Sequence, residues 1–569
     1  MSPVLGRRVV FVVCRWTAAE PDLVRRLTCT YRPWFGADCT ARVRRLPGAR
    51  LAVALVGVPD LLPEEVPDVF AWGTAVGATG LATAAELRAA AATPSRAADL
   101  LGSFVIVRAG TDDVRLVVSA DLVHVARHVT GEDGEAWSGH GLAAAVASGR
   151  VLAVRREPVP ELLLTDYVWA DDELIDGVSV LREATTVDVR GAAVTSSEWW
   201  PAADRLMARD DVSPQELRSE VCRTLAQLLR TGPLELALTA GRDSTLLASC
   251  LAELGAAIPC FTMGGPEDPD SVGARAVAER LGWDHELVSH DPHGQPSTER
   301  LLRITRWTEG LDTAWNGIGA PLRWHPTRPV QLYGIGGEMG RAFYWGRLDD
   351  AALLRSPAAV MAEGSGLQPQ AAEVFRARAD SFELQLRERG WTGTGVLDGW
   401  HAHGRVRKWP MRTPPPPGVA TLLTAYPAAR LAGALLGLPS SGRRDSSAFD
   451  EAARLGGDLH GVALAAQHQR VPVQPARRHL PGRRWRARRH DVSVRLASAT
   501  QRDLGLASSP VDDVLGRSWR RAVGRTVGAA EHRWRWNALA VDALAADLAG
   551  LSTDPDVRAW RRADDPVQA

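Results

Sequence analysis

The residues with the clearest chemical potential lie between Leu234 and Cys250, in the sequence LELALTAGRDSTLLASC. The apolar run Leu234 to Leu238 predicts a buried strand, and helix-forming residues follow from Thr245 to Leu254. The glycine-containing loop Thr239 to Ser244 joins them, so it would present free backbone N–H groups at the positive end of a helix dipole, which favours a phosphate. Asp243 offers oxygen ligands for a magnesium ion beside that phosphate. The loop therefore predicts nucleotide chemistry.

Nucleotide binding by this loop has a structural alternative. A strand, loop and helix can pack together without any ligand, and the residue types alone do not exclude that. The loop is not the P-loop of kinases and GTPases, because the G-x-x-x-x-G-K-[ST] spacing and its lysine are missing.

The residues that follow predict further alternation of strands and helices. Ile258 to Met263 has the pattern of a second strand, Asp270 to Leu281 that of a helix, and His285 to Val288 that of a third strand. This order is typical of a parallel doubly wound sheet. Ligands of such sheets bind at the carboxyl ends of the strands, so the loops after Leu238 and Met263 should meet there.

Four segments, in order, resemble the asparagine synthetase superfamily. The TAGRDS loop resembles the family's S-G-G-x-D-S loop, and Cys260 to Val288 resembles its second nucleotide-binding stretch. Leu332 to Trp345 (LYGIGGEMGRAFYW) is similar to its S-G-x-G-x-D-E loop, and Thr308 to Asp312 to its E-T-x-D stretch. The resemblance implies an α/β doubly wound PP-loop ATP pyrophosphatase domain (adenine nucleotide α-hydrolase-like) over residues 213–569, with a helical C-terminal part.

Residues 1–205 are β-rich with intervening helices and resemble the superfamily's α+β Ntn-amidotransferase sandwich. In that domain a cysteine after the initiator methionine hydrolyses glutamine, whereas this chain has Ser2 followed by Pro3. The family's asparagine-glycine pair for the oxyanion cannot exist, since no asparagine precedes Asn316. A serine nucleophile is the alternative, but we expect a degenerate glutaminase-like domain. The nucleophile would then be an amine carried by the substrate.

Local patterns predict the elements of this first region and its boundary. The expected strands are 8–14, 178–181 and 186–189, the hairpin is 104–108 with 114–119, the helix is 141–147, and the linker is 202–212. Ser213 and Glu216, with Pro214 between them, form a capping box that starts the next helix.

The resemblance implies a set of nucleotide-site residues. The positions matched to ATP binding are Leu238, Thr239, Ala240, Gly241, Arg242, Asp243, Ser244, Met263, Tyr333 and Gly334. Met263 would contact the adenine, and Tyr333 and Gly334 the ribose and base. The magnesium ligands would be Asp243 and Glu338, although glutamate stands where the family has aspartate.

The candidate catalytic residues are Arg341, Lys408, Glu309 and Asp312. Arg242 and Arg341 could grip pyrophosphate, because guanidinium groups match phosphate geometry. Lys408, the sole lysine, is either the family's transition-state cation or part of a charged helix face, in which case an arginine takes its role. Glu309 or Asp312 either serves as general base for the amine or has a capping or ion-pairing role.

Composition limits the remaining classes of function. The 569-residue chain has a formal net charge of zero, which argues against a nucleic-acid partner. No apolar run is long enough to span a membrane, no signal peptide pattern appears, and six scattered cysteines indicate reduced thiols, so we expect a cytoplasmic enzyme. The basic stretch Arg477 to His490 is either a surface loop or a site for an acidic ligand. Pro510 to Ala563 should be largely helical and pack on the ATP domain.

The leading functional prediction is a macrolactam synthetase similar to lasso peptide cyclases, which uses ATP and Mg²⁺. It would adenylate an Asp or Glu side chain of a precursor peptide and close a ring with the peptide's N-terminal amine, releasing AMP and pyrophosphate. The resemblance implies a leader peptidase and a leader-binding protein as partners. The alternatives are a β-lactam synthetase-like or asparagine synthetase-like ligase for a small molecule, and a non-catalytic scaffold with a relic nucleotide fold.

Overall fold

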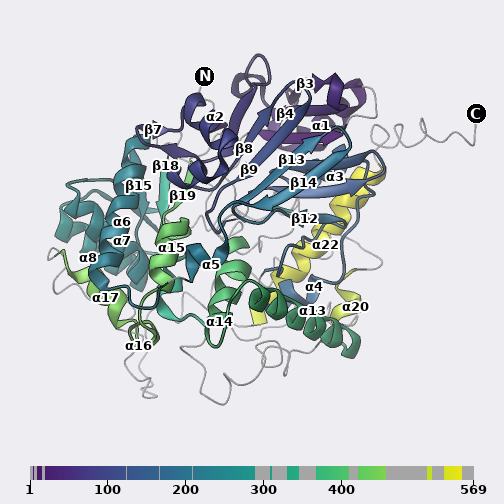
Figure 1. Ribbon diagram of the computed structural model, residues 1–569. Coiled ribbons are helices and arrows are strands. Elements are labelled where there is room, and N and C mark those ends of the chain that lie inside the picture. Colours follow the sequence, from purple (N-terminus) through teal and green to yellow (C-terminus); the bar gives the residue numbers. More distant parts are fainter. Residues whose placement is uncertain are drawn as a thin grey trace, which may run out of the picture.

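The computed structural model contains two β-rich units that share buried cores (Figure 1). It describes residues 4–5, 9–15, 20–123, 125–165, 167–207, 209–288, 308–309, 330–344, 367–408, 421–456, 509–515 and 531–553. Ser2, Asp312 and the basic stretch at 477–490 lie outside these ranges, so their predicted roles stay predictions.

The N-terminal unit is built on two six-stranded sheets. The first has the order β1 (Val4–Leu5), β5 (Val69–Gly73), β8 (Phe104–Ala109), β9 (Asp113–Val118), β13 (Thr185–Arg190) and β14 (Ala193–Glu198). The second has the order β12 (Val178–Val180), β10 (Arg127–Gly131), β11 (Gly134–Ser138), β2 (Val10–Arg15), β4 (Leu51–Gly57) and β3 (Thr40–Leu46). A small hairpin, β6 (Val76–Gly77) with β7 (Gly80–Leu81), forms a separate two-stranded sheet.

Alternating side chains explain how these sheets stack. In β2, Phe11 and Val13 belong to a core shared by both sheets, whereas Val10 and Val12 face helices α1 (Glu20–Phe35) and α3 (Gly141–Ala147). The outer face of the first sheet is covered by α2 (Ala84–Ala92). The result is a helix–sheet–sheet–helix sandwich, so the predicted α+β sandwich is confirmed at this level.

The second unit contains a five-stranded sheet in which every pairing is parallel. Its order is β17 (His285–Val288), β16 (Cys260–Met263), β15 (Leu234–Ala237), β18 (Val330–Tyr333) and β19 (Thr421–Thr424). The helices that accompany it are α6 (Pro214–Leu228), α7 (Arg242–Glu253), α8 (Pro269–Leu281), α15 (Ala429–Leu436), α16 (Ser440–Arg444) and α17 (Ser447–Arg454). The predicted parallel sheet is confirmed. Its chain order reverses between β15 and β18, and such a switch point is where ligands of open parallel sheets bind.

The connection between the units is more structured than predicted. The stretch expected to be a linker contains α5 (Ala202–Leu206), and its Arg205 side chain is fully buried. The capping box at Ser213 is confirmed, because the backbone N–H of Glu216 donates to Ser213 Oγ and that of Ser213 donates to Glu216 Oε2.

The C-terminal helices pack differently from the prediction. Helices α13 (Pro369–Glu388), α14 (Gly395–Gly399), α20 (Asp512–Leu515) and α22 (Glu531–Thr553) are described, with α4 (Val159–Thr165) of the first unit beside α22 (Figure 1). The buried face of α22, including Leu539 and Leu544, joins the core formed by α1, α3 and the second N-terminal sheet. The prediction that this region packs on the ATP domain was therefore wrong for α22. The sequence of an alanine-rich helix does not indicate which surface it packs on, because its apolar face fits many surfaces. Among the described helices, none is long and apolar enough to cross a membrane.

Candidate nucleotide site

The loop after β15 is closed by its own hydroxyl groups. The backbone N–H of Thr239 donates to Ser244 Oγ at 3.0 Å, and that of Gly241 donates to Thr239 Oγ1 at 3.0 Å. Helix α7 then begins at Arg242, three residues earlier than predicted, with Gly241 as its N-cap. The N–H groups of its first turn point to the switch point of the sheet, so they can donate to a phosphate.

The glycine-rich loop after β18 packs directly on the start of α7. A Cβ on Gly334 would lie 2.8 Å from the backbone nitrogen of Ser244, and one on Gly337 would lie 2.5 Å from Asp243 Oδ1. Both contacts are too short for any side chain. The two loops that resemble the family's nucleotide loops are therefore in contact, and glycine at both positions is what permits it.

Asp243 and Arg341 form the charged centre of this contact. Arg341 Nη2 donates to Asp243 Oδ2 at 2.7 Å, and the hydroxyl of Tyr426 donates to the Asp243 carbonyl at 2.7 Å. Asp243 Oδ1 is buried and has no hydrogen-bond partner among the described residues. Burial raises the pKa of Asp243 to about 7, and the nearby Glu338 adds to this rise against the opposing charge of Arg341. A buried carboxylate oxygen without a donor fits a cation ligand.

Glu338 lies in the same loop, within the 3₁₀ helix η5 (Gly337–Arg341), and its carboxylate is almost fully buried. Glu338 Oε2 accepts from the backbone N–H of Gly336 at 3.0 Å, and Oε1 lies 3.9 Å from both His401 Nε2 and Arg405 Nε. Burial alone would raise the pKa of Glu338, but His401 and Arg405 outweigh it and hold the pKa at about 2. Glu338 is therefore ionised at neutral pH.

His401 and Arg405 were missed by the sequence analysis. Both lie in the π-helix η7 (Trp400–Val406), where the His401 ring stacks on Phe343 with centroids 4.6 Å apart. The guanidinium of Arg405 lies over the same ring, 4.9 Å from its centroid. Their spacing of four residues was the available signal, since it places two side chains on one helical face.

Arg242 is not free to grip pyrophosphate. Its guanidinium is buried and makes two hydrogen bonds to the Asp450 carboxylate, one of them from Nη2 to Oδ2 at 3.0 Å. Asp450 belongs to α17, 208 residues further along the chain. The structure therefore gives the Arg242 side chain a packing role, and the backbone of Arg242 remains the part that faces the site.

Lys408 and Glu309 lie away from Asp243, against the N-terminal unit. Lys408 Nζ donates to the Asp172 carbonyl, and burial lowers the pKa of Lys408 to about 8. Glu309 Oε1 accepts from the backbone N–H of Leu142 at 2.6 Å, and Oε2 lies 3.5 Å from Arg127. Neither side chain contacts Asp243 or Glu338, so of the three predicted catalytic residues that the structure describes, only Arg341 lies at Asp243.

The remaining predicted ligand positions line the strand ends. Leu238 and Ala240 are buried, Met263 is 42% exposed at the end of β16, and Tyr333 ends β18. The Tyr333 ring packs edge-on against Phe261, 6.1 Å between centroids. Strand β16 is the neighbour of β15, so the exposed Met263 lies one strand away from the switch point. No described group of three or more His, Cys, Asp or Glu residues could hold a metal ion, so any magnesium here would need phosphate oxygens as further ligands.

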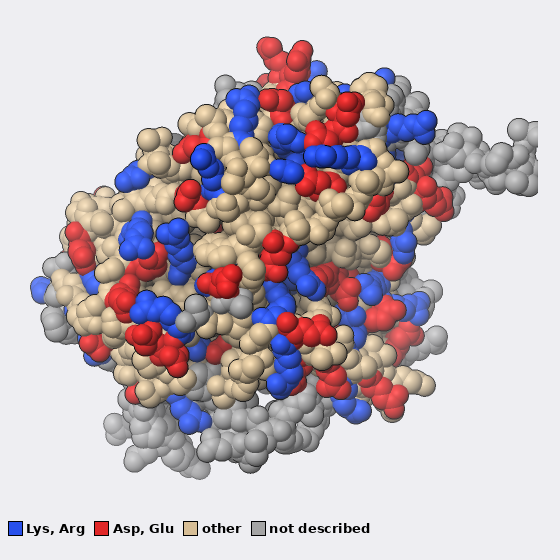
Figure 2. All heavy atoms as spheres, in the orientation of Figure 1, with Lys and Arg blue, Asp and Glu red and all other residues tan. Residues whose placement is uncertain are grey.

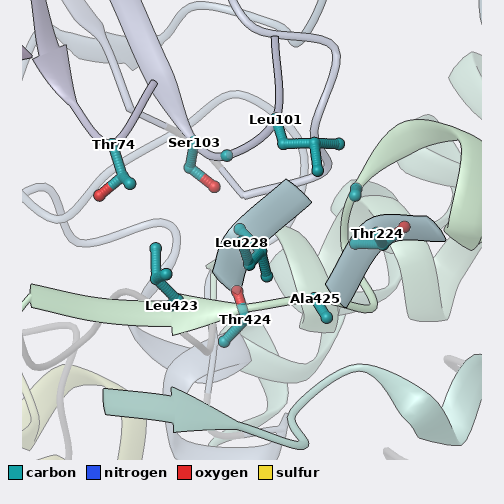
Figure 3. A pocket seen from close by; sticks show the side chains of 10 residues that line it. Thr74, Leu101, Ser103, Thr224, Leu228, Leu423, Thr424 and Ala425 are labelled. Carbon is teal, nitrogen blue, oxygen red and sulfur yellow. The ribbon is translucent and has the colours of Figure 1, made fainter. Parts of the chain in front are cut away.

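A small pocket lies next to this site, between the two units (Figure 3). Thr74 and Ser103 of the N-terminal unit face Thr424 and Ala425 across it, and Leu228 of α6 stands between them. Ala425, which lines the pocket, directly precedes Tyr426, whose hydroxyl contacts Asp243. On the molecular surface, basic and acidic side chains are interspersed over the face shown in Figure 2.

One comparison with known proteins finds a family match for part of the second unit. Residues 216–313 match the family model of asparagine synthase. The match supports the asparagine synthetase superfamily for this part of the chain, and it indicates an ATP-dependent ligase. It begins in α6 and includes the loop at Asp243 and the strands β15 to β17. No curated protein matches the chain.

Two solved structures show weak similarity. The structure of the allosteric regulatory enzyme of purine biosynthesis has a TM-score of 0.21 and 12% identity, over 60% of this chain and 76% of that one. Glutamine phosphoribosylpyrophosphate amidotransferase from B. subtilis, complexed with ADP and GMP, has a TM-score of 0.21 and 11% identity, over 58% and 77%. TM-scores this low are not evidence of a shared fold, so the fold assignment depends on the sheets alone.

Proposed function

We propose that this protein is an ATP-dependent ligase that adenylates a carboxylate and joins it to an amine, releasing AMP and pyrophosphate. The observation that carries the proposal is the contact between the Asp243 loop and the Gly334–Gly337 loop at the switch point of the parallel sheet. Asp243 Oδ1 would hold magnesium, which neutralises triphosphate charge.

The chain's own groups support the first half of this reaction. The N–H groups at the start of α7 donate to the phosphates, and Met263 covers the base. Arg341, fixed on Asp243 at 2.7 Å, places a cation beside the leaving pyrophosphate. The ionised Glu338, with His401 and Arg405 beside it, adds further polar groups to the same loop. Each contribution is one of position and charge rather than covalent chemistry.

We further propose that the amine belongs to the substrate and that the product is a macrolactam. Ser2 replaces the nucleophilic cysteine of the related glutaminase, and no asparagine is available for its oxyanion pair. Ammonia from glutamine is then not the nucleophile, and a peptide that carries both a carboxylate and an amine meets the requirement. The precursor peptide, its leader peptidase and a leader-binding protein are part of this proposal.

The test is ATP–pyrophosphate exchange, followed by mass analysis of a candidate peptide encoded beside the gene. The wild-type protein should exchange pyrophosphate only when the peptide and magnesium are present, and the peptide should lose one water. A peptide with its acidic residue changed to the amide is the matched control and should not react. No exchange with any carboxylate would refute the ligase and favour a scaffold, whereas exchange with a small amino acid derivative alone would favour a β-lactam synthetase-like enzyme.

A protein variant separates the metal role from folding. Asp243→Asn keeps the shape of the side chain but removes its charge, so exchange should fall by about 100-fold or more. Asp211→Asn, at a side chain that is 72% exposed, is the control and should keep full exchange. Unchanged exchange in Asp243→Asn would refute the magnesium assignment.

A further inference from the structure

The π-helix η7 and the residue that follows it present imidazole and guanidinium side chains in two opposite directions. Residues four apart lie on the same side of a helix, and residues two apart lie on opposite sides. His401 and Arg405 therefore share one side, and His403 and Arg407 share the other. The side of His401 and Arg405 meets Glu338 of the nucleotide site.

The opposite side meets two carboxylates of the N-terminal unit: Arg407 Nη1 lies 2.7 Å from Asp171 Oδ1, and both His403 and Arg407 approach Glu183. His403 Nδ1 lies 3.2 Å from Glu183 Oε1, and Arg407 Nε lies 3.7 Å from Glu183 Oε2. Glu183 lies between β12 and β13 and is only 2% exposed. His403 is fully buried and Arg407 nearly so.

Two further guanidinium groups fix Glu183 in place. Arg205 Nη2 donates to Glu183 Oε1 at 3.2 Å from α5, and Arg389 Nη2 donates to the same oxygen at 2.6 Å from the segment after α13. Burial alone would raise the pKa of Glu183, but Arg389, His403 and Arg407 outweigh it and hold the pKa well below its usual range. A buried carboxylate bound by groups from three separate segments holds those segments together, because moving it would break buried charged contacts to all of them.

We propose that Glu183 is a positioning residue for the nucleotide site, which holds η7 so that His401 and Arg405 face Glu338. The proposal rests on the ligase function proposed above. π-Helices are rare and commonly occur at functional sites, so this turn needs support from outside its own backbone. Glu183 supplies that support from residues 1–205. A chain whose glutaminase is degenerate therefore still needs its N-terminal unit, because that unit supports the ATP-using loop.

A simpler possibility is that the Glu183 cluster only stabilises the interface. The positioning role and the structural role differ in how the loss of rate from a Glu183 variant combines with the loss of rate from an Arg405 variant. If Glu183 acts through η7, then removing Arg405 first leaves little for Glu183 to support, and the two effects on the rate are not multiplicative. If the cluster is merely structural, the two losses multiply.

The experiment is a double-variant cycle on ATP–pyrophosphate exchange with the full-length protein. Glu183→Gln should lower the exchange kcat by about tenfold or more while the KM for ATP stays within about twofold, as for other residues that orient a metal-site group. Adding it to Arg405→Met should lower kcat little further. Asp133→Asn breaks another ion pair of the N-terminal unit, with the 2%-exposed Arg26, and is the matched control that should keep kcat. A kcat of Glu183→Gln within twofold of the wild-type value would overturn the proposal. So would a double variant in which the losses of kcat from Glu183→Gln and Arg405→Met multiply.

Amide hydrogen exchange tests the same coupling without activity. In Glu183→Gln, amides 400–408 should exchange faster than in wild type, whereas α7 should not change. If Glu183→Gln does not fold, His403→Gln breaks one of the same contacts and takes its place in both measurements. A wild-type protein without pyrophosphate exchange would refute the ligase function, whereas unchanged protection at 400–408 would refute the positioning role.

Discussion

Gly337 and Asp243 are packed so closely that a Cβ on the glycine would lie 2.5 Å from Oδ1 of the aspartate. These residues belong to loops that follow β18 and β15, the two neighbouring strands at which the sheet order reverses. Asp243 Oδ1 is buried and has no hydrogen-bond partner among the described residues, which leaves it open to a cation.

The first prediction concerns this contact. Gly337→Ala would place a methyl group against Asp243 Oδ1 and Cγ and displace either the carboxylate or the loop. Pyrophosphate exchange should fall by about 100-fold, because a small misplacement of a positioning group is costly in catalysis. Gly395→Ala is the control, since its new Cβ would meet only Trp391 at 3.7 Å, an ordinary contact. Equal activity of the two variants would contradict the contact.

The second prediction is that the Arg242 side chain stabilises the fold and is not needed for catalysis. Asp450→Ala would leave the buried Arg242 guanidinium without its partner, so the free energy of unfolding should fall by about 3–5 kcal/mol. In the double variant Arg242→Met/Asp450→Leu the unpaired charge is gone, so stability should largely return and pyrophosphate exchange should persist. Denaturation midpoints and exchange rates check both statements. Loss of exchange in a stable double variant would restore Arg242 as a phosphate ligand.

The third prediction concerns the stability of the interface as pH changes. Burial raises the pKa of Asp121 from 3.8 to about 7, against the opposing effects of hydrogen bonds from the backbone of Ala429 and Gly102. Between these two pH values Asp121 is deprotonated in the unfolded chain but protonated in the folded protein. The free energy of unfolding therefore falls as the pH rises from about 4 to about 7. The contribution is fully present below that window and is lost above it.

Asp121→Asn should remove this part of the pH dependence, because an amide does not titrate. Thermal midpoints measured from pH 5 to pH 8 should fall less steeply in the variant than in the wild-type protein. The same slope in both would show that Asp121 ionises normally in the folded state.

The fourth prediction concerns Ser2. Ser2→Ala should leave product formation within about twofold, and glutamine should not serve as a nitrogen donor in either protein, because the nucleophilic amine comes from the substrate. Quantifying the product and any released glutamate checks this. Glutamate release by wild type that disappears in the variant would restore the glutaminase.

Local patterns predicted the fold where neighbouring residues decide the structure. The strands around Leu236, Phe261 and Leu287 and the cap at Ser213 follow from short-range periodicity and capping, and all were predicted close to their observed bounds. Helix α7 starts earlier than its apolar residues suggested, because Asp243 is well suited to a first helical turn.

Long-range contacts were beyond such patterns. The Arg242–Asp450 pair joins residues 208 positions apart, and nothing near either residue indicates the other. His401 and Arg405 reach Glu338 from a distant part of the sequence, and their four-residue spacing does not indicate which carboxylate they meet. The alanine-rich α22 has an apolar face that suits several surfaces, which is why its packing against α1 and α3 was not predicted.

The most direct test of the account is a crystal structure with magnesium and a non-hydrolysable ATP analogue. We expect the phosphates to receive N–H groups from Arg242 to Ser244, a magnesium ion on Asp243 Oδ1, and the adenine beside Met263. A nucleotide bound elsewhere, or a switch point that remains closed to it at saturating concentration, would contradict the central claim.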